Sequence, residues 1–78
     1  MTIEMRGQAY KASVKELMAK NWALKMGATV ISRGAFEAWK CLNIVLFGQK
    51  HYIDYSSDKI VLFAYSKYAK DWIPIQEL

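Results

Sequence analysis

The sequence predicts an α+β fold in which two helices pack on a small antiparallel sheet of three strands, with an N-terminal segment as a candidate fourth strand. Apolar residues recur at helical spacing in the first half of the chain, and branched and aromatic residues dominate three short runs in the second half. Turn-forming residues separate these runs. Because the chain has 78 residues, we expect a single small domain, 1–78, with residues 66–78 as a C-terminal tail.

Residues 13–26 give the clearest helical pattern. Ser13 and Glu16 have the spacing of a capping box, in which each side chain satisfies a free backbone amide of the other residue. Gly27 follows the last apolar residue and can end the helix in a left-handed conformation. The apolar stripe at helical spacing is predicted to consist of Val14, Leu17, Met18, Trp22 and Met26.

A second helix is predicted over residues 32–42. Ser32 can cap its N-terminus, and Phe36, Trp39 and Leu42 form its apolar side. The preceding residues 28–31 are too apolar for an ordinary loop, and we expect them to form a short extended segment.

From residue 43 onward the pattern changes to strands. We expect strands over 43–47, 50–55 and 59–65, separated by turn-forming residues. His51, Ile53 and Tyr55 should share one face of the middle strand. Residues 2–9 also alternate as in a strand, although a helical spacing fits the same segment; a strand is preferred, and both alternatives stay open.

Composition limits the class of protein. A hydrophobic content of 54% excludes intrinsic disorder, and the longest apolar runs are far shorter than the roughly 20 residues of a membrane-spanning helix. Cys41 is the single cysteine and the N-terminus does not resemble a signal peptide, so we expect an intracellular, cytoplasmic protein. The net charge of +4 favours acidic partners.

The chemistry-bearing residues do not predict an enzyme. One cysteine and one histidine cannot build a four-ligand zinc site, and no glycine-rich phosphate loop is present. Cys41 and His51 form the only thiol–imidazole combination, and both fit structural roles better. Asp54, Asp58 and Asp71 are candidates for paired carboxylates, but their positions suit strands and turns. We therefore expect a non-catalytic protein without a cofactor.

Binding to another protein is the first functional hypothesis. Two predicted strands are apolar on both faces, so one face needs the C-terminal tail, a second copy of the chain or a partner. Short viral or mobile-element inhibitors of host enzymes and defence systems have a similar size and composition. We expect stoichiometric contact with a larger protein or complex that has an acidic surface, with a homodimer as an option. The expected partner-binding residues are Trp72, Tyr68, Trp39, Lys67 and Lys70.

DNA binding is the alternative. Residues 22–39 resemble a helix-turn-helix element, and the hairpin after residue 43 resembles a wing. The second helix would then contact DNA through Arg33, Glu37 and Lys40.

Binding of RNA or single strands is a third hypothesis. It uses strand aromatics as a stacking platform. The residues are Tyr52, Tyr55, Phe63 and Tyr65.

Overall fold

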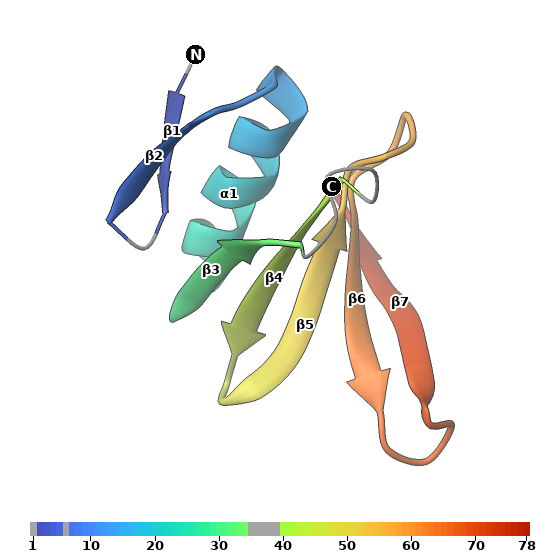
Figure 1. Ribbon diagram of the computed structural model, residues 1–78. Helices are drawn as coiled ribbons and strands as arrows, with labels where there is room; N and C mark the ends of the chain where they lie inside the picture. Colours follow the sequence, from blue (N-terminus) through green and yellow to red (C-terminus); the bar gives the residue numbers. More distant parts are fainter. Residues whose placement is uncertain (1, 6, 35–39) are drawn as a thin grey trace.

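The computed structural model describes residues 2–5, 7–34 and 40–78 (Figure 1). Over this part of the chain it contains one helix and seven strands, arranged as a two-stranded hairpin and a five-stranded antiparallel sheet. In chain order the elements are β1 (Thr2–Met5), β2 (Gln8–Lys11), α1 (Val14–Met26), β3 (Val30–Arg33), β4 (Cys41–Leu46), β5 (Gln49–Asp54), β6 (Val61–Ser66) and β7 (Asp71–Glu77).

The predicted fold class of two helices on a three-stranded sheet is wrong. Ser32 and Arg33, expected to start a second helix, belong to β3, and Cys41 and Leu42 belong to β4. The reason is strand pairing: Val30 and Ile31 lie opposite Val45 and Ile44 in the register of β3 and β4. Branched residues at these positions pack well on a sheet, and this tertiary pairing overrides the local helical periodicity. Phe36 and Trp39 lie outside the described residues.

The main sheet is a meander with the strand order β3-β4-β5-β6-β7. The three predicted strands are confirmed with shifts of one or two residues at their ends. The turn between β4 and β5 is formed by Phe47 and Gly48, both with positive φ, as in a two-residue hairpin turn. His51 and Ile53 are buried on one face of β5, as the alternation predicts.

The segment expected as a C-terminal tail contains the edge strand β7. A turn over residues 67–70 reverses the chain, and β7 then pairs along β6, with a bulge between Leu62 and Phe63. Strand β7, which carries Trp72, Ile73 and Ile75, therefore extends the sheet beside β6 (Figure 1).

Helix α1 confirms the predicted element and both of its ends. The Ser13 hydroxyl oxygen accepts a hydrogen bond from the Glu16 N–H at 3.2 Å, and Gly27 ends the helix at φ 89°. The buried face differs from the predicted stripe, because Val14 and Met18 are exposed. The buried residues of the helix are Glu16, Ala19, Trp22 and Ala23.

The core lies between α1 and one face of the main sheet. It contains Ala19, Trp22 and Ala23 of the helix together with strand residues from β4, β5 and β6. The largest fully buried side chains are Leu42 and Ile53. Helix α1 covers only this face of the sheet. We call the opposite face the open face, and no described helix packs on it.

The N-terminal segment forms strands, as preferred from the sequence, but they do not join the main sheet. β1 and β2 pair with each other in a separate hairpin beside α1 (Figure 1). Among the described residues, the side chains of Lys20 and Arg33 attach this hairpin to the rest of the molecule. The Lys20 amino group donates to the carbonyl oxygen of Glu4, and the Arg33 guanidinium donates to that of Lys11.

Candidate functional site

Four aromatic side chains gather on the open face and form what we call the aromatic patch: Tyr52, Phe63, Tyr65 and Trp72. Tyr52 and Phe63 are stacked, with ring centroids 4.6 Å apart and planes 9° apart. Trp72 meets Tyr52 and Tyr65 edge-on, at centroid distances of 4.8 and 5.4 Å. Tyr65 and Trp72 remain 46% and 36% exposed, so the patch presents a large aromatic area to solvent.

Strand register places the aromatic patch. Tyr52 lies opposite Phe63 in the β5–β6 ladder, and Tyr65 lies opposite Trp72 in the β6–β7 ladder. Residues opposite each other in a ladder share a face, and residues two apart on one strand do so as well. The four side chains therefore converge from three neighbouring strands onto one rigid surface.

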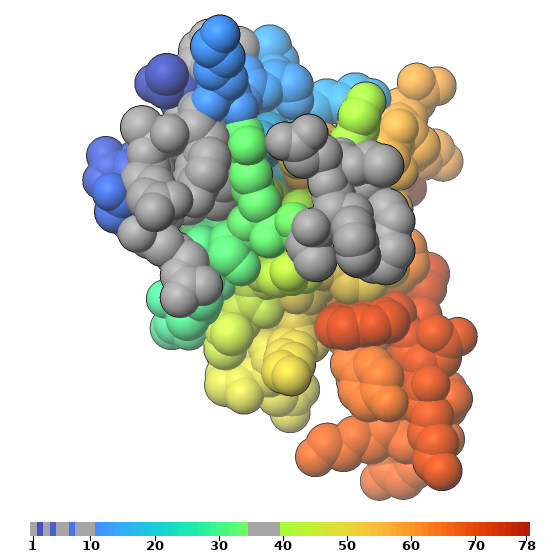
Figure 2. Space-filling view, viewed as in Figure 1, coloured from blue at the N-terminus to red at the C-terminus, as the bar shows by residue number. Residues whose placement is uncertain are grey.

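The turn between β6 and β7 carries three further residues that the sequence analysis selected. Tyr68 is fully exposed, and Lys67 and Lys70 are exposed on either side of it. Lys50, at the start of β5, lines a shallow pocket together with Lys67 and Tyr68. The hairpin that holds this turn projects from the body of the molecule (Figure 2, orange to red).

The structure thus brings together four of the five expected partner-binding residues. Trp72, Tyr68, Lys67 and Lys70 lie on the β6–β7 hairpin. Trp39 lies outside the described residues. Sequence reasoning missed Lys50, although its position two residues before Tyr52 places it on the same strand face.

The surroundings of the aromatic patch are basic at the β6–β7 end. Lys50, Lys67 and Lys70 are exposed there, and Asp71 is the acidic residue beside them. The Asp71 carboxylate accepts a hydrogen bond from the Trp72 N–H at 2.7 Å. Burial, followed by the negative charge of Asp54, raises the pKa of Tyr52, so its hydroxyl stays protonated and can donate a hydrogen bond.

The second helix of the predicted helix-turn-helix element does not form at its two ends, because Ser32 and Arg33 belong to β3 and Leu42 belongs to β4. The Arg33 guanidinium binds inside the protein instead of projecting from a recognition helix. Lys40 is exposed just before β4, and Glu37 lies outside the described residues. Of these three residues, Arg33 and Lys40 line one pocket near the start of α1.

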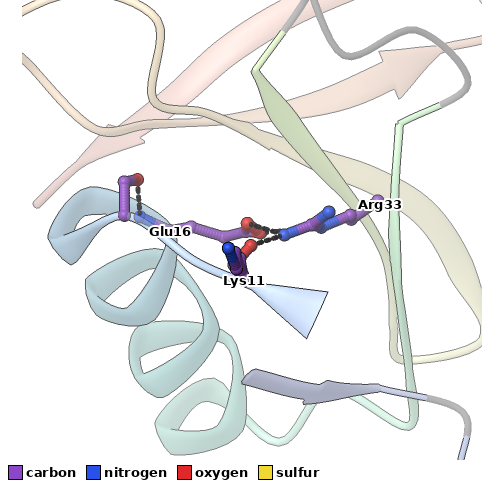
Figure 3. A network of polar contacts seen from close by, with 4 residues as sticks. Lys11, Glu16 and Arg33 are labelled. Carbon is purple, nitrogen blue, oxygen red and sulfur yellow. Dashed lines mark hydrogen bonds and ion pairs between the residues drawn. The ribbon is translucent and has the colours of Figure 1, made fainter. Parts of the chain in front are cut away.

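A buried ion pair joins α1 to β3 (Figure 3). The Glu16 carboxylate accepts hydrogen bonds from Nε and Nη2 of Arg33 at 2.9 and 2.8 Å. The Glu16 side chain is only 4% exposed, whereas that of Arg33 is 31% exposed. Arg33 also donates to the Lys11 carbonyl oxygen, so one guanidinium connects β2, α1 and β3.

One of the two contacts predicted for the capping box is replaced by this ion pair. Ser13 caps the helix as expected, but the Glu16 carboxylate binds Arg33. A signal was present in the sequence: Glu16 lies three residues before Ala19 and seven before Ala23, a spacing that puts all three on one helix face, which the core covers. A carboxylate on a buried helix face requires a cationic partner.

Cys41 and His51 do not form a catalytic pair. Cys41 lies opposite Asp54 and His51 lies opposite Ile44 in the β4–β5 register, so their side chains are on opposite faces of the sheet. His51 is buried, with Nδ1 2.9 Å from the carbonyl oxygen of Gln49. Burial and then the charge of Asp54 raise the pKa of the Cys41 thiol. The described residues contain no group of three or more metal-ligating side chains.

Tyr55 provides a test of the electrostatics around the ion pair. Burial, followed by the negative charge of Glu16, raises its pKa to about 12, against an opposing effect of Arg33. As the pH rises, the unfolded chain therefore loses this phenolic proton at a lower pH than the folded protein does. The stability that the neutral phenol contributes is complete below about pH 10 and is lost as the pH rises toward 12.

We expect urea denaturation to show a steeper loss of stability between about pH 10 and pH 12 for the wild type than for Tyr55→Phe. Tyr68→Phe, at an exposed turn position, is the matched control and should follow the wild type. Parallel curves for the wild type and Tyr55→Phe would contradict the prediction.

Comparison of the chain with protein-family models, curated proteins and solved structures finds no match. Among the described residues, no helix has the length and apolar character needed to cross a membrane.

Proposed function

We propose that this is a non-catalytic binding protein that attaches to an acidic surface of a larger protein or complex and inhibits it by occupying that surface. The contact is made by the aromatic patch and the β6–β7 turn. One observation carries the proposal: tryptophan and tyrosine side chains lie together, partly exposed, on the sheet face opposite α1. Exposed apolar patches of this kind are typical of interaction sites.

The composition of the surface supports a protein partner. Trp and Tyr are the residues that most often dominate the energetics of protein interfaces. Their rigid side chains lose little conformational entropy on binding, and here the regular strands already hold them in place. Lys50, Lys67 and Lys70 surround one end of the aromatic patch and would accelerate association with an acidic partner.

The ring geometry favours protein over single-stranded nucleic acid. Tyr52 and Phe63 cover one face of each other, and the edge of Trp72 packs against Tyr52. Base binding on a sheet uses free ring faces as platforms. Tyr55, the remaining member of that hypothesis, is partly buried and packs against the core.

Photo-crosslinking in the producing cells tests the proposal. A crosslinking amino acid placed at position 68 should capture one acidic protein, whereas the same group at position 24, exposed on α1, should not. Labelled mixed-sequence DNA, single- or double-stranded, should bind weakly at about 50 mM salt and not measurably at about 200 mM. Tight DNA binding without a crosslinked protein would refute the proposal.

Trp72→Ala should then weaken binding of the captured partner by at least about tenfold, as expected for a central aromatic anchor. Far-ultraviolet circular dichroism and the melting curve should change little, because Trp72 lies on an edge strand and is partly exposed. Ile75→Ala, an exposed position on the same strand, is the control and should bind normally. Unfolding of Trp72→Ala would show that Trp72 belongs to the core and would remove it as an anchor.

A further inference from the structure

A second surface feature lies just beyond the C-terminal end of β5. A pocket of about 480 Å³ opens where the end of β2, the first turn of α1, β3 and the residues after β5 meet. Its volume is within the range of small-molecule sites. The lining residues are Lys11, Ser13, Val14, Lys15, Glu16, Arg33, Lys40, Tyr55 and Ser56.

The pocket is strongly basic. Four of its described lining residues are cationic, and Glu16 is the single carboxylate among them. Glu16 is buried and bound by Arg33, so these two charges compensate each other. Among the described residues, no carboxylate forms an ion pair with the amino groups of the remaining three. These are Lys11, Lys15 and Lys40.

Backbone contacts hold these lysines around the pocket from three separate segments. The Lys40 carbonyl oxygen accepts a hydrogen bond from the Tyr55 N–H at 3.0 Å, which fixes Lys40 beside Tyr55. The Lys11 carbonyl oxygen is held by Arg33, as Figure 3 shows. Lys15 is anchored through its amino group, which donates a hydrogen bond to the carbonyl oxygen of Ser57.

Hydroxyl groups supply neutral donors at the same place. The Ser13 oxygen accepts from the Glu16 N–H, which leaves its own O–H available to donate. The raised pKa of Tyr55 keeps its phenol protonated at neutral pH. Lysine side chains and hydroxyl donors that line one concave site match the needs of a multiply charged oxyanion.

We propose that this pocket binds a phosphate dianion, either as free phosphate or as the phosphate group of a small phosphomonoester. Three lysines can compensate its charge, and the hydroxyl groups can donate to its remaining oxygens. The phosphate site is separate from the aromatic patch, so the proposal of phosphate binding can be tested independently of the proposed protein interface.

Thermal unfolding of the full chain in sodium phosphate, compared with sodium chloride at equal ionic strength, tests the proposal. A ligand that binds the native state raises the melting temperature, so phosphate should raise it above the chloride value. Isothermal titration with inorganic phosphate should give a saturable heat with one site per chain. Equal melting temperatures in the two salts, with no saturable heat, would overturn the proposal.

Charge-removing variants locate the site. Lys40→Gln and Lys15→Gln should each lower phosphate affinity about tenfold, the usual effect of losing one charged hydrogen bond. Lys25→Gln is the matched control, because Lys25 is exposed in the last turn of the same helix. The affinity of the Lys25→Gln variant for phosphate should be unchanged. Equal affinities for all three variants would place phosphate elsewhere and refute the site.

Glucose 6-phosphate distinguishes the two sources of the anion. Tighter binding than inorganic phosphate would assign the pocket to phosphomonoesters, and equal or weaker binding would assign it to free phosphate. Glucose itself should not bind. Binding of glucose as tight as that of glucose 6-phosphate would contradict recognition of the phosphate group.

Discussion

Replacement of Ile53 by alanine is expected to lower the free energy of unfolding by about 3 kcal/mol, within the usual range for a buried large-to-small change. Ile53 is 0% exposed and lies on the central strand β5, facing α1. The loss combines the transfer free energy of the removed groups with the cavity left behind. Urea denaturation followed by far-ultraviolet circular dichroism measures the change.

Ile75→Ala is the matched control for this variant. It removes the same atoms from a side chain that is 54% exposed on the edge strand β7. We expect a change of less than about 0.5 kcal/mol there, as for most surface positions. Equal effects at the two positions would show that the core does not lie between α1 and the sheet face that carries Ile53.

Replacement of Arg33 by alanine is expected to cost about 2 to 3 kcal/mol, slightly below the usual range for breaking a buried ion pair because Arg33 is partly exposed. The variant leaves the Glu16 carboxylate buried without its cation. It also removes the donor to the Lys11 carbonyl oxygen, which connects the β1–β2 hairpin to the main sheet. Urea denaturation again measures the loss.

Two further variants separate the ion pair from simple loss of packing. Glu16→Leu combined with Arg33→Met should recover most of the lost stability, since replacing a whole buried pair by apolar groups is often neutral. Lys59→Ala removes the exposed ion pair with Glu77, at 3.6 Å, and should cost less than about 1 kcal/mol. A double variant no more stable than Arg33→Ala would contradict this account of Glu16.

Local signals explain which elements were predictable. Helix α1 has its cap at Ser13 and its stop at Gly27, both of which act through nearby backbone atoms, and its bounds followed directly. The prediction of a second helix failed because β3 forms by pairing with β4, nine to fifteen residues further along the chain. Strand β7 was missed for a similar reason, since only pairing with β6 distinguishes it from an extended tail.

The candidate sites likewise combine features that are local in sequence with features that depend on strand pairing. Trp72, Tyr68, Lys67 and Lys70 are close in sequence, so the sequence could group them without knowledge of the fold. The contact of Trp72 with Tyr52 depends on the register of three strands, which no local pattern specifies. The phosphate site depends on segments from residue 11 to residue 56 meeting at one place.

The order of strands in the main sheet has a consequence for how the chain folds. Each strand pairs with its neighbour in sequence, so the sheet grows by successive hairpins and requires no threading of one segment past another. Such local topologies close short loops first and fold faster than sheets with long-range pairings. Because β7 follows the other strands of the main sheet in the chain and is an edge strand, it can join a sheet that β3 to β6 have already formed. The surface that carries Trp72 would then be completed only in the last step of sheet formation, when β7 pairs with β6.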